Sequence, residues 1–139
     1  MNQPSKQRGS TLIDICAACL MGSVTMALAL PSYQNHLERT QRNDAVSALQ
    51  RVQQAQVRHL VEHGSFAMRL EQLGGAGATL SERGMYRITM FSEGPHSFEA
   101  RAVALPDRDQ AKDPGCTHLT LRVTNGAAAY EPTARCWTP

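Results

Sequence analysis

The feature that most constrains this chain is an apolar segment near its N-terminus. Residues 10–31, STLIDICAACLMGSVTMALALP, contain a single charged side chain, Asp14. A helix of about 20 residues spans about 30 Å, which matches the hydrocarbon core of a bilayer. The preceding residues 1–9 carry Lys6 and Arg8, and flanking basic residues tend to stay in the cytoplasm. We therefore expect residues 10–31 to cross the membrane once, with the rest of the chain outside the cytoplasm.

Asp14 distinguishes the alternative interpretations of this segment. The segment could be a secretory signal cleaved after Ala29, which would release a periplasmic binding domain, or a plain membrane anchor. In both cases the Asp14 carboxylate would only make insertion into the membrane less favourable, by about 2.5–3.5 kcal/mol on insertion scales. A buried acid is better explained where a cation neutralises it. We therefore expect Asp14 to be functional and to have a cationic partner.

The segment resembles the N-terminal signature of type IV prepilins, in which a short basic leader ends in Gly and precedes an apolar helix. Here the leader would be residues 1–9, cut after Gly9, so that Ser10 becomes the N-terminus and Asp14 the fifth residue. The resemblance implies that a prepilin peptidase removes the leader and methylates the Ser10 amino group. It also implies that Asp14 neutralises this ammonium group, usually that of a neighbouring subunit, within a filament.

Two residues depart from the family's usual pattern. The first mature residue is usually Phe and is Ser10 here, and the acid is usually Glu and is Asp14 here, one methylene shorter. The sequence LPSYQ at residues 30–34, which closes the apolar stretch, does match many pilins. These departures indicate a divergent or minor subunit.

Residues 32–63 are predicted to continue the helix as an amphipathic segment. They contain no Gly, Pro31 is expected to kink the helix, and Gly64 is expected to end it. Small or apolar residues and one histidine recur at three- and four-residue steps: Ala45, Ala48, Leu49, Val52, Ala55 and His59. A narrow stripe of this kind favours packing against a flat surface such as a sheet.

The end of this helix carries the only pattern typical of metal chemistry. His59, Glu62 and His63 form H-x-x-E-H, which matches the inverted zinc-protease motif. No distant third ligand accompanies the motif, so we interpret it as a solvated helix end and predict no metal site. The sequence also has no nucleophile–base pair, and Gly74–Gly77 lacks the lysine of a phosphate-binding loop. We predict no cofactor and no enzymatic activity.

Period-two alternation begins after a predicted connecting loop at residues 64–83, which Phe66, Leu70 and Leu73 would tether to the core. Residues 84–139 are predicted to form a sheet head, because alternation of this kind indicates half-buried strands. A turn at 92–95 and another at Asn125-Gly126 separate the predicted strands, which are Met85–Phe91, Ser97–Ala104, Thr117–Thr124 and Ala127–Tyr130. The expected fold class is α+β, with one long N-terminal helix packed on an antiparallel sheet of about four strands.

The four cysteines fall into two pairs that differ in chemistry. Cys116 and Cys136 lie in the part expected outside the cytoplasm, where oxidation is favoured. A disulfide between them would close a loop of about 20 residues and contribute about 3 kcal/mol, and two reduced thiols are the alternative. Cys16 and Cys19, three residues apart on one helix, are expected to be packing residues. An intersubunit bridge or a lipidation site is their alternative role.

The C-terminal region resembles pilins independently of the N-terminus. It contains Asp113-Pro114-Gly115-Cys116, then Leu119-Thr120-Leu121, then Asn125-Gly126, and finally Cys136-Trp137. Many pilins close in this way, and their disulfide-bounded loop, here 116–136, faces the surface. The resemblance implies a structural subunit of a type IV pilus, held in the inner membrane by its helix until the pilus assembly machinery extracts it. Its partners would be other pilin subunits and the prepilin peptidase, and its final location the extracellular pilus.

Charge weighs against a strongly basic nucleic-acid binder. The formal net charge is +2, from 14 basic and 12 acidic residues, and the predicted leader alone contributes two of the basic residues. A minor pilin that binds DNA during uptake nevertheless remains an alternative function, because Arg87, Arg101 and Arg122 are predicted on the outward face of the sheet. The other interpretation of these arginines is a solvated face that Glu99 partly neutralises. A type II secretion pseudopilin is the other alternative, although the best-known major pseudopilins lack the C-terminal cysteine pair.

Overall fold

The computed structural model describes residues 12–138, although the side chains of Asp14, Ala18, Ala76 and residues 21–36 lie outside that description. The chain divides into two units, Met1–His36 and Leu37–Pro139. In chain order the elements are α1 (Leu12–His63), the 3-10 helix η1 (Leu70–Gly77), β1 (Tyr86–Gly94), β2 (Ser97–Ala104), the 3-10 helix η2 (Asp109–Lys112), β3 (His118–Thr124), β4 (Ala127–Glu131) and α2 (Ala134–Trp137).

In the first unit the structure describes only part of helix α1. Cys16 and Cys19 are exposed, free thiols on this helix. Within the described residues, we find no helix that combines the length and the apolar character needed to cross a membrane. The predicted leader 1–9 and Ser10 lie outside the described residues, and so does the side chain of Asp14.

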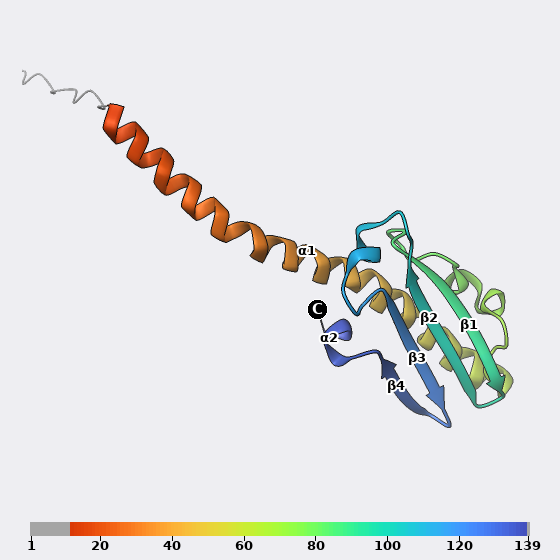
Figure 1. The fold of residues 1–139 in the computed structure, drawn as a ribbon. Coiled ribbons are helices and arrows are strands. Elements are labelled where there is room, and N and C mark those ends of the chain that lie inside the picture. Colours follow the sequence, from red (N-terminus) through yellow and green to blue (C-terminus); the bar gives the residue numbers. More distant parts are fainter. Residues whose placement is uncertain (1–11, 139) are drawn as a thin grey trace, which may run out of the picture. The chain divides into compact units, whose positions relative to one another are not determined.

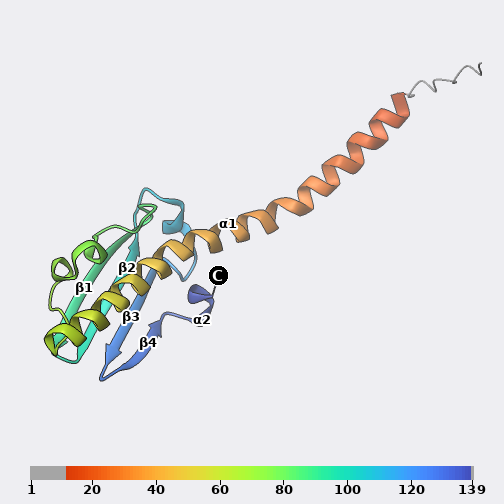
Figure 2. The same ribbon diagram turned by 180° about the vertical axis from the view of Figure 1, so that it is seen from behind.

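The second unit is an α+β head built on an antiparallel sheet. Its four strands lie in the order β1-β2-β3-β4, so each strand pairs with its neighbour in the chain (Figure 1). The part of α1 that belongs to this unit lies across one face of the sheet, as the view from behind shows (Figure 2). The predicted fold class is confirmed for the head, including the strand number and the antiparallel pairing.

Alternation along the strands separates the two faces of the sheet. The core between α1 and the sheet contains buried residues of both: Ala45, Ala48, Leu49, Val52, Tyr86, Ile88, Phe98, Ala100, Ala102, Leu119, Leu121 and Val123. The helical stripe was predicted correctly from Ala45 to Val52. One turn later Gln56 is the fully buried residue, whereas Ala55 and His59 are only partly buried.

The first hairpin turn differs from the prediction. Strand β1 continues to Gly94, which pairs with Ser97, so the turn comprises Pro95 and His96 rather than residues 92–95. The register shifts between Phe91 and Gly94. The hydroxyl of Ser92 donates to the carbonyl oxygens of both Gly94 and Ser97 at 2.9 Å, which holds the two strands together up to this tight turn.

The loop after α1 is held by one buried amide. Gln56 Nε2 donates to the Ala67 carbonyl at 3.0 Å, and Ala67 N–H donates to Gln56 Oε1 at 2.8 Å. The side chain thus pairs with the loop backbone as a neighbouring strand would. Phe66 and Leu70, predicted to tether this loop, are buried in the core, and Leu73 packs against it.

Candidate functional site

The outward face of the sheet brings together the three predicted arginines. Arg87 lies on β1, Arg101 on β2 and Arg122 on β3, and all three are exposed. Arg101 is paired with Thr89 on one side and Thr120 on the other in the strand register. The strand alternation therefore predicted correctly that these side chains share one face, away from the core.

An acid lies between two of these arginines. Glu99 on β2 is the direct cross-strand partner of Arg122, and Arg101 is two residues further along the same face. Glu99 Oε2 accepts from Arg122 Nε at 3.0 Å and from Arg122 Nη2 at 2.6 Å, and Oε1 accepts from Arg101 Nη2 at 2.7 Å. A second acid, Glu131, is 3.9 Å from Arg122 Nη1. Two of the three arginines are thus ion-paired.

These contacts change the proton affinities of the groups involved. The hydrogen bonds from Arg122, and next those from Arg101, hold the pKa of the Glu99 carboxyl below its ordinary value, although partial burial opposes them. The same contact with Glu99 raises the pKa of Arg122. At neutral pH the face therefore carries a fully ionised Arg–Glu–Arg cluster. Among the described residues, no acid lies within ion-pair distance of Arg87.

Two hollows adjoin this face along β1. One, of about 270 Å³, is lined by Thr89, Met90, Phe91, Glu99 and Arg101. Phe91 is 63% exposed on this face, which also carries the exposed Val103. The other is an open groove of about 870 Å³ between β1 and the loop after α1, with Met68, Arg69 and Gln72 among its lining residues. The face therefore combines cationic groups with an accessible aromatic ring.

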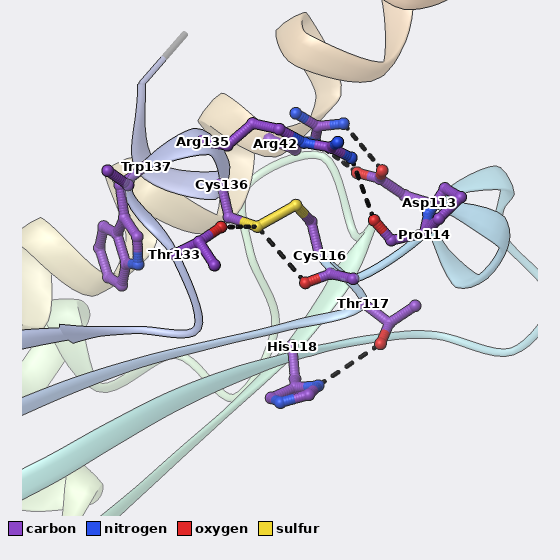
Figure 3. The surroundings of a disulfide bond; sticks show 12 residues. Arg42, Asp113, Pro114, Cys116, Thr117, His118, Thr133, Arg135, Cys136 and Trp137 are labelled. Carbon is purple, nitrogen blue, oxygen red and sulfur yellow. Dashed lines mark hydrogen bonds and ion pairs between the residues drawn. A yellow bond between two sulfur atoms is a disulfide. The ribbon is translucent and has the colours of Figure 1, made fainter.

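A disulfide fastens the C-terminal segment to the loop before β3 (Figure 3). Cys116 and Cys136 are bonded with an S–S distance of 2.03 Å, which confirms the predicted pairing. Beside them Arg135 Nη2 donates to the Pro114 carbonyl at 3.1 Å, and the Cys136 sulfur is 3.4 Å from the Gly115 carbonyl oxygen. The short C-terminal segment is thereby tied to the loop that precedes β3.

A buried ion pair joins the same loop to α1. Arg42 donates through Nε to Asp113 Oδ2 and through Nη2 to Asp113 Oδ1, the latter at 2.8 Å (Figure 3). The Asp113 side chain is fully buried, and this hydrogen bonding raises the pKa of Arg42. Nearby, Tyr86 Oη donates to Gln110 Oε1 at 2.6 Å, and Gln110 Nε2 donates to Gln41 Oε1 at 2.7 Å. These contacts hold the loop between β2 and β3 against the helix.

The sequence does not predict this polar network. Asp113 belongs to the Asp-Pro-Gly-Cys motif, but nothing in the sequence pairs it with Arg42, which lies 71 residues earlier. Gln110 and Gln56 read as ordinary polar residues although both are fully buried. A glutamine on the apolar stripe of a helix is the one sequence signal that indicates a buried partner.

The two histidines of the H-x-x-E-H pattern at the end of α1 contact each other and the backbone. The rings of His59 and His63 stack with centroids 4.1 Å apart, and each Nδ1 contacts a backbone carbonyl oxygen. In the described part of the chain, no three histidine, cysteine or acidic side chains are grouped so that they could hold a metal ion.

Residues 31–120 match the sequence model of a family described as type IV minor pilin ComP, DNA uptake sequence receptor. This range includes the helix from Pro31 on, strands β1 and β2, and β3 as far as Thr120. No curated protein matches the chain. The matched range covers well over half of the chain and contains the strands that carry Arg87 and Arg101. The fold also agrees with the resemblance seen in the sequence. This chain therefore belongs to the ComP family of type IV minor pilins.

Proposed function

We propose that this minor pilin binds DNA during its uptake and that the outward face of the sheet is where DNA docks. The match to a family described as a DNA uptake sequence receptor is the observation that carries the proposal. The geometry supports it, because Arg87, Arg101 and Arg122 share one exposed face. Arginine serves both phosphate and base contacts through its planar set of N–H donors.

We further propose that the subunit enters the filament through its N-terminal segment. Removal of the leader after Gly9 would free the Ser10 amino group, and Asp14 would neutralise this group on a neighbouring subunit. Before assembly, the apolar segment would hold the chain in the inner membrane with the head in the periplasm, and the assembly machinery would extract it. The prepilin resemblance of residues 1–14 supports this route.

The charge of the head sets the expected strength of DNA binding. Glu99 neutralises part of the arginine face, so few phosphates can be bound and non-specific affinity should be modest. Arg87 is the residue best placed for a phosphate contact, because no acid of the described residues pairs with it. Each phosphate neutralised contributes about −0.9 to the slope of log affinity against log salt concentration.

Fluorescence anisotropy of labelled duplex DNA with the full chain in a non-ionic detergent tests the proposal. We expect binding that weakens as salt concentration rises. Arg87→Ala should weaken binding to all sequences and reduce the salt slope by about 1. Arg58→Ala, which removes an exposed arginine of α1, is the matched control and should bind as the wild type does.

Two results would count against the proposal. Absence of salt-dependent binding by the full chain would exclude a DNA receptor. Unchanged affinity in Arg87→Ala, Arg101→Ala and Arg122→Ala would show that DNA docks elsewhere on the molecule.

A further inference from the structure

Glu99 is an unexpected residue at the centre of a surface that would bind a polyanion. Its side chain is only 20% exposed and accepts hydrogen bonds from both Arg101 and Arg122. An ordinary phosphate-binding stripe gains affinity from every cation it exposes, and an acid at its centre reduces that gain. The position of Glu99 therefore needs an explanation other than affinity.

Arg101 and Arg122 differ in the N–H donors that remain free beside Glu99. Arg122 commits Nε and Nη2 to Glu99, and its Nη1 lies 3.9 Å from Glu131. Arg101 commits one N–H of Nη2, so that the second Nη2 hydrogen and the Nε and Nη1 groups have no partner among the described residues. The side chains remain half exposed, at 51% for Arg101 and 50% for Arg122. Arg101 is thus oriented by Glu99 and still has free N–H donors.

Electrostatics decides which acceptor can use these donors. A phosphate that approaches Arg101 or Arg122 must come close to the ionised Glu99 carboxylate, and the two anions repel each other. The major-groove edge of guanine presents two uncharged acceptors, O6 and N7, in the spacing that an arginine fork matches. The nearby carboxylate therefore repels a neutral acceptor much less than it repels a phosphate.

We propose that Glu99 is a specificity-determining residue that makes Arg101 a reader of guanine and keeps Arg101 and Arg122 from binding phosphates. This inference rests on the proposed DNA-binding function of the same face. Glu99 acts through the arginines as a positioning residue and does not itself contact DNA. Arg87, which has no such acid beside it, remains the phosphate contact of the face.

The hollow beside Arg101 agrees with a base edge as the ligand. It is lined by Phe91 as well as by Glu99 and Arg101, so an apolar surface adjoins the free N–H donors. A base edge offers acceptors and carbon atoms side by side, whereas a phosphate offers only charged oxygens. The composition of the hollow therefore suits a base better than the DNA backbone.

The test uses Glu99→Gln in the full chain, with duplexes selected by the wild-type protein from a random pool. In each selected duplex the guanines are replaced one at a time by 7-deazaguanine, which keeps base pairing but lacks the N7 acceptor. We expect at least one replacement to weaken wild-type binding by roughly fivefold or more. Glu99→Gln should lose most of this discrimination, bind unselected DNA more tightly, and show a salt slope steeper by about 1 to 2.

Glu131→Gln is the matched control. It removes the same charge from the same face, but Glu131 makes only a 3.9 Å contact with Arg122 and none with Arg101. We expect this variant to retain the wild-type response to 7-deazaguanine. Arg101→Ala should lose the response, as Glu99→Gln does.

The outcomes separate this inference from the proposed function. If the wild type binds DNA but Glu99→Gln keeps the full response to 7-deazaguanine, Glu99 merely neutralises the face and the inference is wrong. A wild type that binds DNA with no sensitivity to any 7-deazaguanine also overturns it. If the wild type binds no DNA at all, the proposed function fails first.

Discussion

At the scale of single residues, buried polar groups decide how the head is held together. Arg42 donates two hydrogen bonds to Asp113 across the interface between α1 and the loop before β3. Removal of one partner leaves a buried charge without compensation, which typically costs about 3–5 kcal/mol. A comparable exposed pair contributes much less, because water screens it.

Arg42→Met and Asp113→Asn should each lower the free energy of unfolding by about 3–5 kcal/mol in urea titrations of the full chain. Arg51→Met, which breaks the exposed pair of Arg51 with Glu82 at 3.3 Å, should cost less than about 1 kcal/mol. The double variant Arg42→Met with Asp113→Asn should lose less than the two single changes together. Strict additivity would contradict a direct interaction.

Tyr86 gives the head a dependence on alkaline pH. Burial, and next the nearby Asp113 charge, raise the pKa of Tyr86 above its ordinary value of about 10. Above about pH 10 the unfolded chain releases a proton that the folded head retains, so stability falls as pH rises. The contribution of the protonated, hydrogen-bonded hydroxyl is fully present below that pH.

We expect Tyr86→Phe to be less stable than the wild type at about pH 8, by about 1–3 kcal/mol, because Gln110 loses its donor. This difference in the free energy of unfolding should shrink at about pH 10.5, where ionisation of Tyr86 in the unfolded chain lowers the stability of the wild type only. Tyr130→Phe, which removes the same hydroxyl from a half-exposed tyrosine, is the matched control. A stability difference that does not vary with pH would show that Tyr86 does not cause the alkaline pH dependence.

At the scale of elements, the end of α1 and the loop after it behave as one piece because of Gln56. Its amide satisfies both the N–H and the C=O of Ala67 in the interior. The loop in turn contributes a short bridge to β1, between Leu80 and Arg87, and its Thr79 carbonyl accepts from Ile88 N–H at 2.8 Å. The β1 edge of the sheet is therefore supported by this loop.

Gln56→Leu should destabilise the head by about 1–3 kcal/mol for each backbone group left unpaired. The local readout is hydrogen exchange, in which the Ala67 amide should lose its protection more than the amides of β2. Gln54→Leu, at an exposed position of the same helix, is the control and should leave that amide unchanged. Equal protection of Ala67 in both variants would show that Gln56 does not hold the loop.

The elements also show how far periodicity is reliable. The alternation of β2 gave its bounds, Ser97–Ala104, and the faces of its residues, because neighbouring side chains face opposite sides. The end of β1 was misjudged by three residues, since Ser-Glu-Gly-Pro reads as a turn until the backbone pairing of Gly94 with Ser97 is known. Local turn propensity yielded there to the tertiary pairing of the strands.

At the scale of the whole molecule, we propose that the head and the N-terminal segment have separate tasks. The head has its own core and a disulfide that joins Cys116 with Cys136. In the chain-entropy model this cross-link is worth about 3 kcal/mol, a large share for a small domain. Entry into the filament is proposed to depend instead on Asp14.

Asp14→Ala should strongly reduce the fraction of the chain found in sheared filaments while its amount in the membrane fraction stays the same. The reason is that the Ser10 ammonium of a neighbouring subunit would lose its counter-charge in an apolar core. Asp14→Glu keeps the charge and should assemble. Both fractions can be measured by immunoblotting of cells that make this pilus, and normal incorporation of Asp14→Ala would refute the role.

By itself, the sequence determined the fold class, the antiparallel strands and the face on which each arginine lies, because hydrophobic periodicity and turn dipeptides are local properties. It also indicated the disulfide and the pilin family from short motifs at both ends. Only the tertiary structure decided that Glu99 is clamped between Arg101 and Arg122, and that Arg42 meets Asp113 in the interior. Such contacts join residues distant in the chain, and strand register and packing create them without any local signal.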